Sequence, residues 1–211
     1  YHSSTLSDSY NYYVNNYSRV NTTPKSEIRD RNGKVVMELE TADLSSLFAA
    51  GYQFPQPFKA KAADGITDVY GVMYKPFKMD STKTYPILEY VYPGPQTEAV
   101  SFKFSPRMDR TDRFAQLGFI VIALGNRGGS PNRSQWYHTY GYGDLRDYGL
   151  ADKKYVVEQL ADRFDFIDID KVGISGHSGG GFMSTAALLQ YPDFYKVAVS
   201  SAGNHENNIY N

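Results

Sequence analysis

The sequence predicts an α/β fold in which helices cover both faces of a mainly parallel β-sheet. From Tyr85 onward, short apolar runs alternate with segments of helical periodicity. One run, residues 118–130 ("GFIVIALGNRGGS"), is continuous enough in apolar residues to be buried on both faces, as parallel strands are. Strands that alternate with helices in this way form a sheet between two helical layers.

The first 48 residues have another character, because they are rich in Tyr, Asn and Ser and contain short β-like runs. In residues 26–40 two such runs flank Asn32-Gly33, a pair that supplies the positive φ angles of a tight hairpin turn. The polar-aromatic alternation of residues 9–18 predicts another strand, and residues 41–51 predict a short helix or a loop.

The remaining elements follow in order, with about six strands between Phe58 and Ala202. The strands are expected within 57–76 (a hairpin turning at Asp64-Gly65), 85–95, 118–130, 171–175 and 195–203; the helices within 108–119, 143–163 and 180–192. The helix within 143–163 has the strongest signal, with Asp144 as a plausible N-cap and Asp147 three residues later.

Composition excludes several classes of function. The net charge of −1 gives no global electrostatic field that would attract nucleic acid. The sequence has no Lys/Arg run that would bind a membrane surface and no apolar run of about 18 residues that would span a membrane. The absence of cysteine removes disulfides, cysteine catalysis and thiolate metal sites. It leaves the compartment open, although a periplasmic or secreted parent protein is favoured. We expect no metal and no cofactor.

Residues 172–183, "VGISGHSGGGFM", contain the pattern G-x-S-x-G at Gly176, Ser178 and Gly180. Alone this pattern is weak, but here it lies between a predicted strand and a predicted helix, where a nucleophile elbow must lie. The glycines are needed because side chains would collide with neighbouring backbone. Ser178 is the expected nucleophile, at a helix N-terminus that favours negative charge. A glycine-rich phosphate loop or a plain tight turn is the alternative, but the stretch lacks the Lys-Ser/Thr pair of a phosphate loop.

Several segments, in register, together resemble the serine peptidases of the prolyl oligopeptidase family, closest to the dipeptidyl peptidase IV branch. Residues 83–95 resemble the family's strand ending in Tyr-x-Gly-Pro, residues 118–130 its Asp-x-Arg-Gly-Ser strand, and residues 173–184 its Gly-x-Ser-x-Gly-Gly elbow. Residues 9–40 resemble the last propeller strands, and residues 61–76 the first catalytic-domain hairpin.

The resemblance implies an α/β-hydrolase fold that is incomplete, lacking its last strands, in residues 49–211. It also implies terminal β-propeller strands in residues 1–48. Ser178 falls on the family's nucleophile, and Tyr92 on the tyrosine whose hydroxyl donates to the oxyanion. Gly179 follows the nucleophile and supplies the backbone N–H that completes the hole.

Two departures from the family pattern stand out. His177 and Gly179 replace a Trp and a Tyr that often flank the nucleophile, and Gly125 stands where the strand-end motif has an acid. These changes affect the expected substrate preference more than the reaction. Arg127, in the same motif, is expected to be a structural hydrogen-bonding residue.

A serine nucleophile needs a histidine base and an orienting carboxylate, which follow it along the chain in α/β-hydrolases. None of the candidates suits these roles; they are His2, His138, His177, His205, Asp193 and Glu206. His177 adjoins Ser178 but is expected to point away from its hydroxyl, and Asp193 is better explained as a turn former. The acid and base are therefore expected beyond Asn211, in a longer parent chain, and the 211-residue chain alone is expected to be inactive.

The leading hypothesis is a serine peptidase that cleaves short peptides, dipeptidyl peptidase-like, through an acyl-enzyme on Ser178. A carboxylesterase or acyl-peptide hydrolase of the same fold is the first alternative, since "GHSGG" also suits esterases. A non-catalytic hydrolase-like module is the second. The expected partner is a peptide substrate, and homo-oligomers are possible.

Overall fold

The computed structural model describes residues 1–93, 97–105, 107–143 and 149–206. The chain divides into two compact units, one of residues 1–56 with 102–107 and one of residues 57–101 with 108–211. The sequence placed a domain boundary after residue 48; the assignment of the two sides to a propeller and a catalytic domain stays a prediction.

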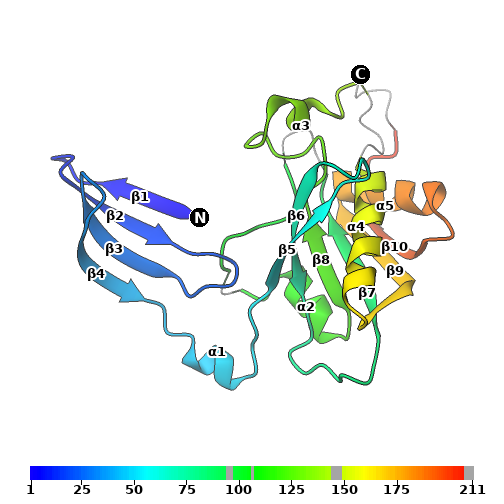
Figure 1. Ribbon diagram of the computed structural model, residues 1–211, viewed down its shortest axis with the longest axis horizontal. Helices are drawn as coiled ribbons and strands as arrows, with labels where there is room; N and C mark the ends of the chain where they lie inside the picture. Colours follow the sequence, from blue (N-terminus) through cyan, green and yellow to red (C-terminus); the bar gives the residue numbers. More distant parts are fainter. Residues whose placement is uncertain (94–96, 106, 144–148, 207–211) are drawn as a thin grey trace. The chain divides into compact units, whose positions relative to one another are not determined.

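The first unit is built on an antiparallel sheet of four strands in the order β1-β2-β3-β4 (Figure 1). Their bounds are β1 His2–Leu6, β2 Tyr12–Tyr17, β3 Lys25–Asp30 and β4 Val35–Thr41, and the short helix α1 spans Ser45–Ala49. The predicted turn joins β3 and β4. Only Gly33 of the pair has a positive φ, 86°, because Asp30 Oδ1 accepts the N–H groups of Asn32 and Lys34 and shapes the rest of the turn.

The second unit contains a six-stranded sheet in the order β10-β9-β7-β8-β6-β5. The bounds are β5 Gln56–Lys61, β6 Asp68–Tyr74, β7 Tyr85–Val91, β8 Ile120–Leu124, β9 Ile167–His177 and β10 Tyr195–Ser201. The four strands β7 to β10 run parallel to one another, whereas β6 is antiparallel to β8. The predicted mainly parallel sheet is confirmed, and β8 is buried along its whole length as its apolar sequence predicted.

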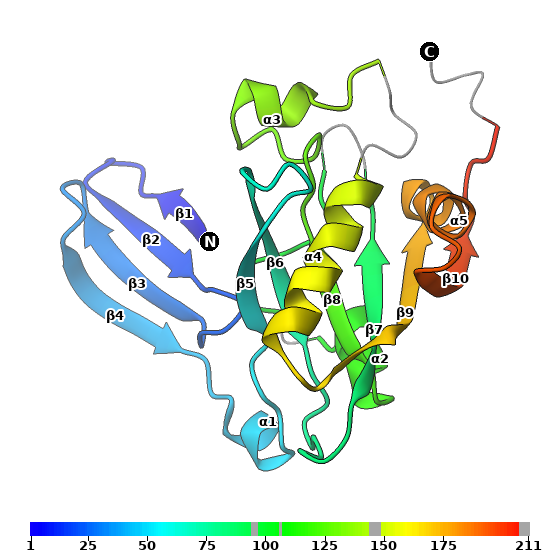
Figure 2. The same cartoon turned by 45° about the vertical axis from the view of Figure 1, so that its right-hand side comes forward.

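Helices lie on both faces of this sheet, as predicted. Their bounds are α2 Arg110–Gln116, α3 Gln135–Thr139, α4 Leu150–Arg163 and α5 Gly179–Gln190. On one face Ile87 of β7 joins a large apolar cluster with residues of α4 and α5. On the other face its neighbour Leu88 packs with Ala115 of α2. Adjacent strand residues point to opposite faces, so the two clusters lie on opposite sides; Figure 2 shows α4 crossing in front of the strands.

Two details differ from the sequence-based expectations. Helix α4 begins at Leu150, with Gly149 at the N-cap; Asp144 and Asp147, the predicted cap and its partner, lie outside the described residues. The short helix α3 was not predicted, because its polar-aromatic sequence has no helical periodicity. Its N-cap is Ser134, whose side chain accepts the N–H of Tyr137.

The parallel strands place their carboxyl ends at one edge of the sheet. Tyr92 follows β7, the Arg127 loop follows β8, and Ser178 follows β9. Polar residues that are far apart in the sequence therefore gather at this edge, which is where open α/β sheets bind their ligands.

Candidate active site

Ser178 occupies a strained turn between β9 and α5. Its backbone angles are φ 56° and ψ −118°, which are those of the first central position of a type II′ turn and are usually adopted by glycine. The N–H of Ser178 donates to Ser201 O at 2.8 Å, and its carbonyl accepts the N–H of Phe182 at 3.0 Å. The turn is therefore held on both sides, and the surrounding structure imposes the strain.

The glycines around Ser178 leave room for the end of β7. A Cβ atom added at Gly180 would lie 2.1 Å from the carbonyl oxygen of Val91, and one at Gly176 would lie 2.5 Å from the same atom. At Gly179 an added Cβ would lie 2.9 Å from the carbonyl oxygen of Pro93. These contacts are with backbone, which cannot move aside as a flexible side chain can. All three positions therefore require glycine for close packing.

This packing brings Tyr92 to the elbow. Val91 pairs with Gly176 in the parallel ladder between β7 and β9, so Tyr92 lies one residue beyond that pair and Ser178 two residues beyond it. Tyr92 is 38% exposed, which leaves its side chain accessible to a ligand. The structure thus brings the predicted nucleophile and both predicted oxyanion donors, Tyr92 and Gly179, to one place.

Helix α5 adds a favourable field at this place. Its twelve residues begin directly after Ser178, so the unpaired N–H groups of its first turn face the carboxyl edge of the sheet. The helix dipole gives that end a partial positive charge. A negative oxygen formed next to Ser178 would be stabilised by both effects.

The histidines have other partners. His177 Nδ1 lies 3.0 Å from Ser201 Oγ, and His138 Nδ1 lies 3.0 Å from the carbonyl oxygen of Gly129. His205 packs near Phe182, with ring centroids 6.4 Å apart, and His2 stacks on Tyr17 in the other unit. Within the described ranges, no histidine and no carboxylate hydrogen bonds to the Ser178 hydroxyl. Asp193 lies in the turn between α5 and β10.

Arg127 is a structural residue, as the sequence predicted. Its guanidinium donates to Asp152 through Nη2 at 2.6 Å and Nε at 3.0 Å, and to Asp64 through Nη1 at 3.0 Å. Burial raises the pKa of Asp64, but hydrogen bonds from Thr67 and Ile66 and the charge of Arg127 outweigh it and lower the pKa to about 2. These ion pairs tie the loop after β8 to α4 and to the β5–β6 turn.

A second buried ion pair was not predicted from the sequence. Glu89 of β7 and Lys153 of α4 are buried, with Lys153 Nζ 3.2 Å from Glu89 Oε1. Tyr195 donates its hydroxyl to Glu89 Oε2 at 3.3 Å. Burial raises the pKa of Glu89, while Lys153 and Tyr195 oppose that effect. The sequence did contain a signal for this pair, because Glu89 is a charged residue inside the apolar run "PILEYV".

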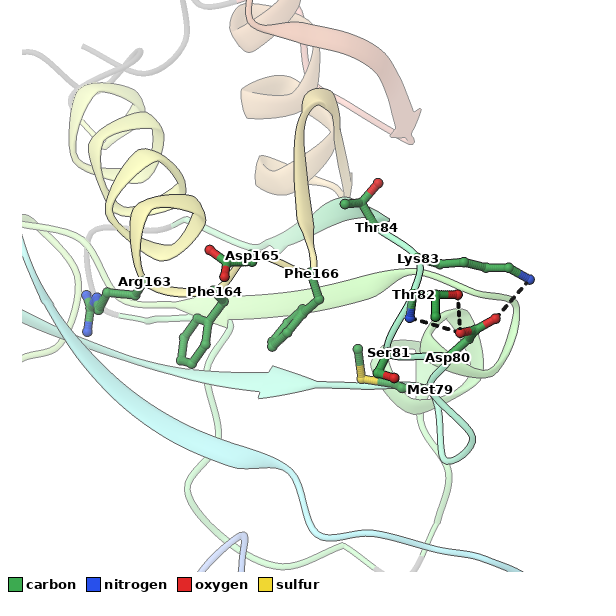
Figure 3. Close-up of a pocket in the computed structure, with 10 residues that line it drawn as sticks. All are labelled: Met79, Asp80, Ser81, Thr82, Lys83, Thr84, Arg163, Phe164, Asp165 and Phe166. Carbon is green, nitrogen blue, oxygen red and sulfur yellow. Dashed lines mark hydrogen bonds and ion pairs between the residues drawn. The ribbon is translucent and has the colours of Figure 1, made fainter.

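A surface pocket of about 530 Å³ lies at the opposite edge of the sheet (Figure 3). It is lined by residues 79–84, which precede β7, and residues 163–166, which precede β9. In it, Phe164 and Phe166 stack with ring centroids 5.2 Å apart, and Asp80 accepts hydrogen bonds from Thr82. None of the predicted site residues lines this pocket.

The described residues contain neither a membrane-spanning helix nor a cluster of metal-ligating side chains. Across residues 1–93, 97–105, 107–143 and 149–206, no helix is long and apolar enough to span a bilayer. In the same ranges no three His, Asp or Glu side chains gather as metal ligands would.

Comparisons with known proteins give consistent results. The family model described as "Prolyl oligopeptidase family" matches residues 104–211. Dipeptidyl peptidase 8 of Homo sapiens is 34% identical over 152 residues, which are 72% of this chain and 17% of that protein. Prolyl endopeptidase FAP of Mus musculus is 27% identical over 150 residues, which are 71% of this chain and 19% of that protein.

A solved structure is also similar. It is the crystal structure of a protein assigned as a dipeptidyl aminopeptidase IV from Bacteroides ovatus ATCC 8483. The TM-score is 0.79 at 31% sequence identity, and the match covers 96% of this chain and 29% of that chain. The present chain therefore spans less than a third of each of these relatives.

Proposed function

This chain belongs to the prolyl oligopeptidase family, and we propose that the protein carrying it is a serine peptidase that releases dipeptides from short peptides. The proposal starts from the family membership of the chain and from the α/β-hydrolase fold of its second unit. The names of the relatives support a peptidase of the dipeptidyl peptidase kind.

The observation that carries the proposal is the backbone of Ser178. A serine held at φ 56° and ψ −118°, where glycine is normally found, between a strand and a helix, is the geometry of a nucleophile elbow. A turn without a chemical role would adopt glycine here and avoid the strain.

The reaction proposed for this geometry is acyl transfer through an ester of Ser178. The hydroxyl of Ser178 attacks the peptide carbonyl, whose oxygen becomes negative in the tetrahedral intermediate. The N–H of Gly179 and the hydroxyl of Tyr92 donate hydrogen bonds to that oxygen, and the amine leaves with a proton. Water then attacks the Ser178 ester, which releases the dipeptide as a carboxylic acid and returns the proton to the Ser178 hydroxyl. The histidine that moves this proton, and its carboxylate, must come from elsewhere in the full-length protein, since no described residue takes this role at Ser178.

The test compares substrates and variants in the full-length protein. Hydrolysis of Gly-Pro-p-nitroanilide should exceed hydrolysis of short acyl esters and of acetylated peptides, and Ser178→Ala should abolish it. Ser81→Ala, at the opposite edge of the sheet, is the matched control and should retain full activity. Preference for acyl esters or acetylated peptides would instead support an esterase or acyl-peptide hydrolase. No hydrolysis of any substrate would support a non-catalytic module.

A further inference from the structure

The carboxyl end of strand β10 lies directly against the nucleophile elbow. In the parallel ladder between β9 and β10, Ser201 pairs with His177. The next residue of the elbow is also bound to this strand end, because the N–H of Ser178 donates to the carbonyl oxygen of Ser201 at 2.8 Å. One of the two backbone hydrogen bonds that hold the strained nucleophile is therefore made by the carbonyl group of Ser201.

The side chain of Ser201 fixes this carbonyl group from one face of the sheet. Its hydroxyl oxygen lies 3.0 Å from His177 Nδ1, and the two atoms share a hydrogen bond. The two residues are neighbours across the ladder, so both side chains point to the same face. This His177–Ser201 pair therefore joins β9 to β10 one residue before Ser178.

The other face of the same strand end is bound to α5. Adjacent strand residues point to opposite faces, and the hydroxyl of Ser200 donates to the carbonyl oxygen of Gly181 at 2.8 Å. A Cβ atom added at Gly181 would lie 2.6 Å from the carbonyl oxygen of Ser201, so this close approach requires glycine. The strand end is thus attached to the first turn of α5 on one side and to His177 on the other.

Backbone strain occurs on both strands at this contact. In the part of the chain that the structure describes, the non-glycine residues with a positive φ are Tyr10, Ser178 and Ala202, with values of 56°, 56° and 47°. Ser178 directly follows His177, and Ala202 directly follows Ser201. Such conformations persist only where the surrounding structure imposes them. The His177–Ser201 pair restrains the chain at the start of both strained turns.

The pair also gives a role to a departure from the resembled family pattern. His177 stands where the family often has a Trp. The imidazole Nδ1 is attached directly to Cγ, so it can reach a serine hydroxyl on the neighbouring strand, whereas the indole nitrogen lies one atom farther from Cγ. The hydrogen bond directs the His177 ring toward β10, which fits a supporting role and not that of the base.

We propose that His177 and Ser201 are positioning residues for the reaction, because their side-chain hydrogen bond fixes the carbonyl group that binds the N–H of Ser178. This inference rests on the proposed function, in which Ser178 is the nucleophile. Neither residue touches the reacting atoms in this role; both act through the backbone of Ser178. A nucleophile must be aligned with the carbon that it attacks, and a displacement of about 1 Å costs a large factor in rate.

The test is a double-mutant cycle in the full-length protein, measured with Gly-Pro-p-nitroanilide. His177→Ala and Ser201→Ala should each lower kcat about 10-fold with KM nearly unchanged, because the Ser178 hydroxyl is misaligned while substrate binding is intact. The double variant should lie within about twofold of either single variant, since both substitutions remove the same hydrogen bond. Ser81→Ala, at the opposite edge of the sheet, is the matched control and should leave kcat unchanged.

Two conservative variants keep the test valid if an alanine variant folds poorly. His177→Asn places an amide atom near the position of Nδ1, and Ser201→Thr keeps the hydroxyl, so each should restore kcat to within about threefold of the wild-type value. Titration of Ser178 with a fluorophosphonate probe counts the folded active sites. The expected fall is in kcat per titrated site, which loss of folded protein alone would not change.

The outcomes separate the two proposals. If Ser178→Ala retains the wild-type kcat, the proposed function fails and the positioning role fails with it. If Ser178→Ala abolishes hydrolysis but kcat per titrated site is unchanged in His177→Ala and Ser201→Ala, or their losses multiply in the double variant, only the positioning role is overturned. A rise in KM at unchanged kcat would also overturn it, because His177 would then act in substrate binding.

Discussion

Replacing Ser178 by glycine should stabilise the protein relative to replacing it by alanine. Both substitutions remove the hydroxyl and abolish activity. Only alanine keeps the Cβ atom that makes φ 56° and ψ −118° unfavourable. The pair therefore measures the strain at the elbow separately from the chemistry.

The magnitude follows from two opposing contributions. A non-glycine residue held in such a sparsely populated conformation costs about 1–3 kcal/mol. Glycine loses more backbone freedom on folding than alanine, which costs about 0.5–1 kcal/mol. The free energy of unfolding of Ser178→Gly should therefore exceed that of Ser178→Ala by about 1 kcal/mol.

The measurement is urea denaturation of both variants, followed by circular dichroism, with the midpoints compared at equal slope. The same pair of substitutions at Ser81, where φ is not positive, is the control, and glycine there should be no more stable than alanine. If Ser178→Gly is no more stable than Ser178→Ala, the elbow is not strained and the reasoning about Ser178 is wrong.

Three other predictions concern packing and charge. Gly180→Ala, whose Cβ would meet the Val91 carbonyl oxygen, should lower kcat about 100-fold, because β7 and Tyr92 must move; Ser81→Ala, at the opposite edge of the sheet, should not, and equal kinetics would contradict the packing argument. Asp152→Ala should lower the free energy of unfolding in urea by about 3 kcal/mol, since the buried Arg127 loses its fully buried partner and keeps only Asp64; a loss below about 1 kcal/mol would show that water replaces the carboxylate. Burial raises the pKa of Asp112 to about 6, so the folded state binds its proton more tightly than the unfolded state, and stability should fall as pH rises from about 4 to about 6. Asp112→Asn should remove this part of the pH dependence in thermal denaturation; an unchanged pH profile would assign it to other groups.

The elbow was predictable from the sequence because its determinants are local. The glycines, the serine and the flanking strand and helix lie within about twenty consecutive residues, and each restricts the same turn. The order of strands and helices was predictable for a similar reason, since apolar periodicity reflects burial of neighbouring residues. The family resemblance then suggested Tyr92, which the structure brings beside Ser178.

Other features were not predictable because they depend on distant contacts. The pairing of Glu89 with Lys153 joins residues 64 positions apart in the sequence, and no local pattern shows which buried charges meet. Glu98 appears in the sequence as an ordinary acidic residue after a turn. Only the structure shows that the Glu98 side chain fills the space that side chains at Gly125 and Gly129 would occupy.

Covalent labelling tests the central claim, that Ser178 is the nucleophile, most directly. The full-length protein is treated with a fluorophosphonate probe, digested, and analysed by mass spectrometry. The account predicts one stoichiometric adduct on Ser178, loss of peptidase activity in step with labelling, and no adduct in Ser178→Ala. An active enzyme that is labelled on another residue, or that keeps its activity after Ser178→Ala, would contradict it.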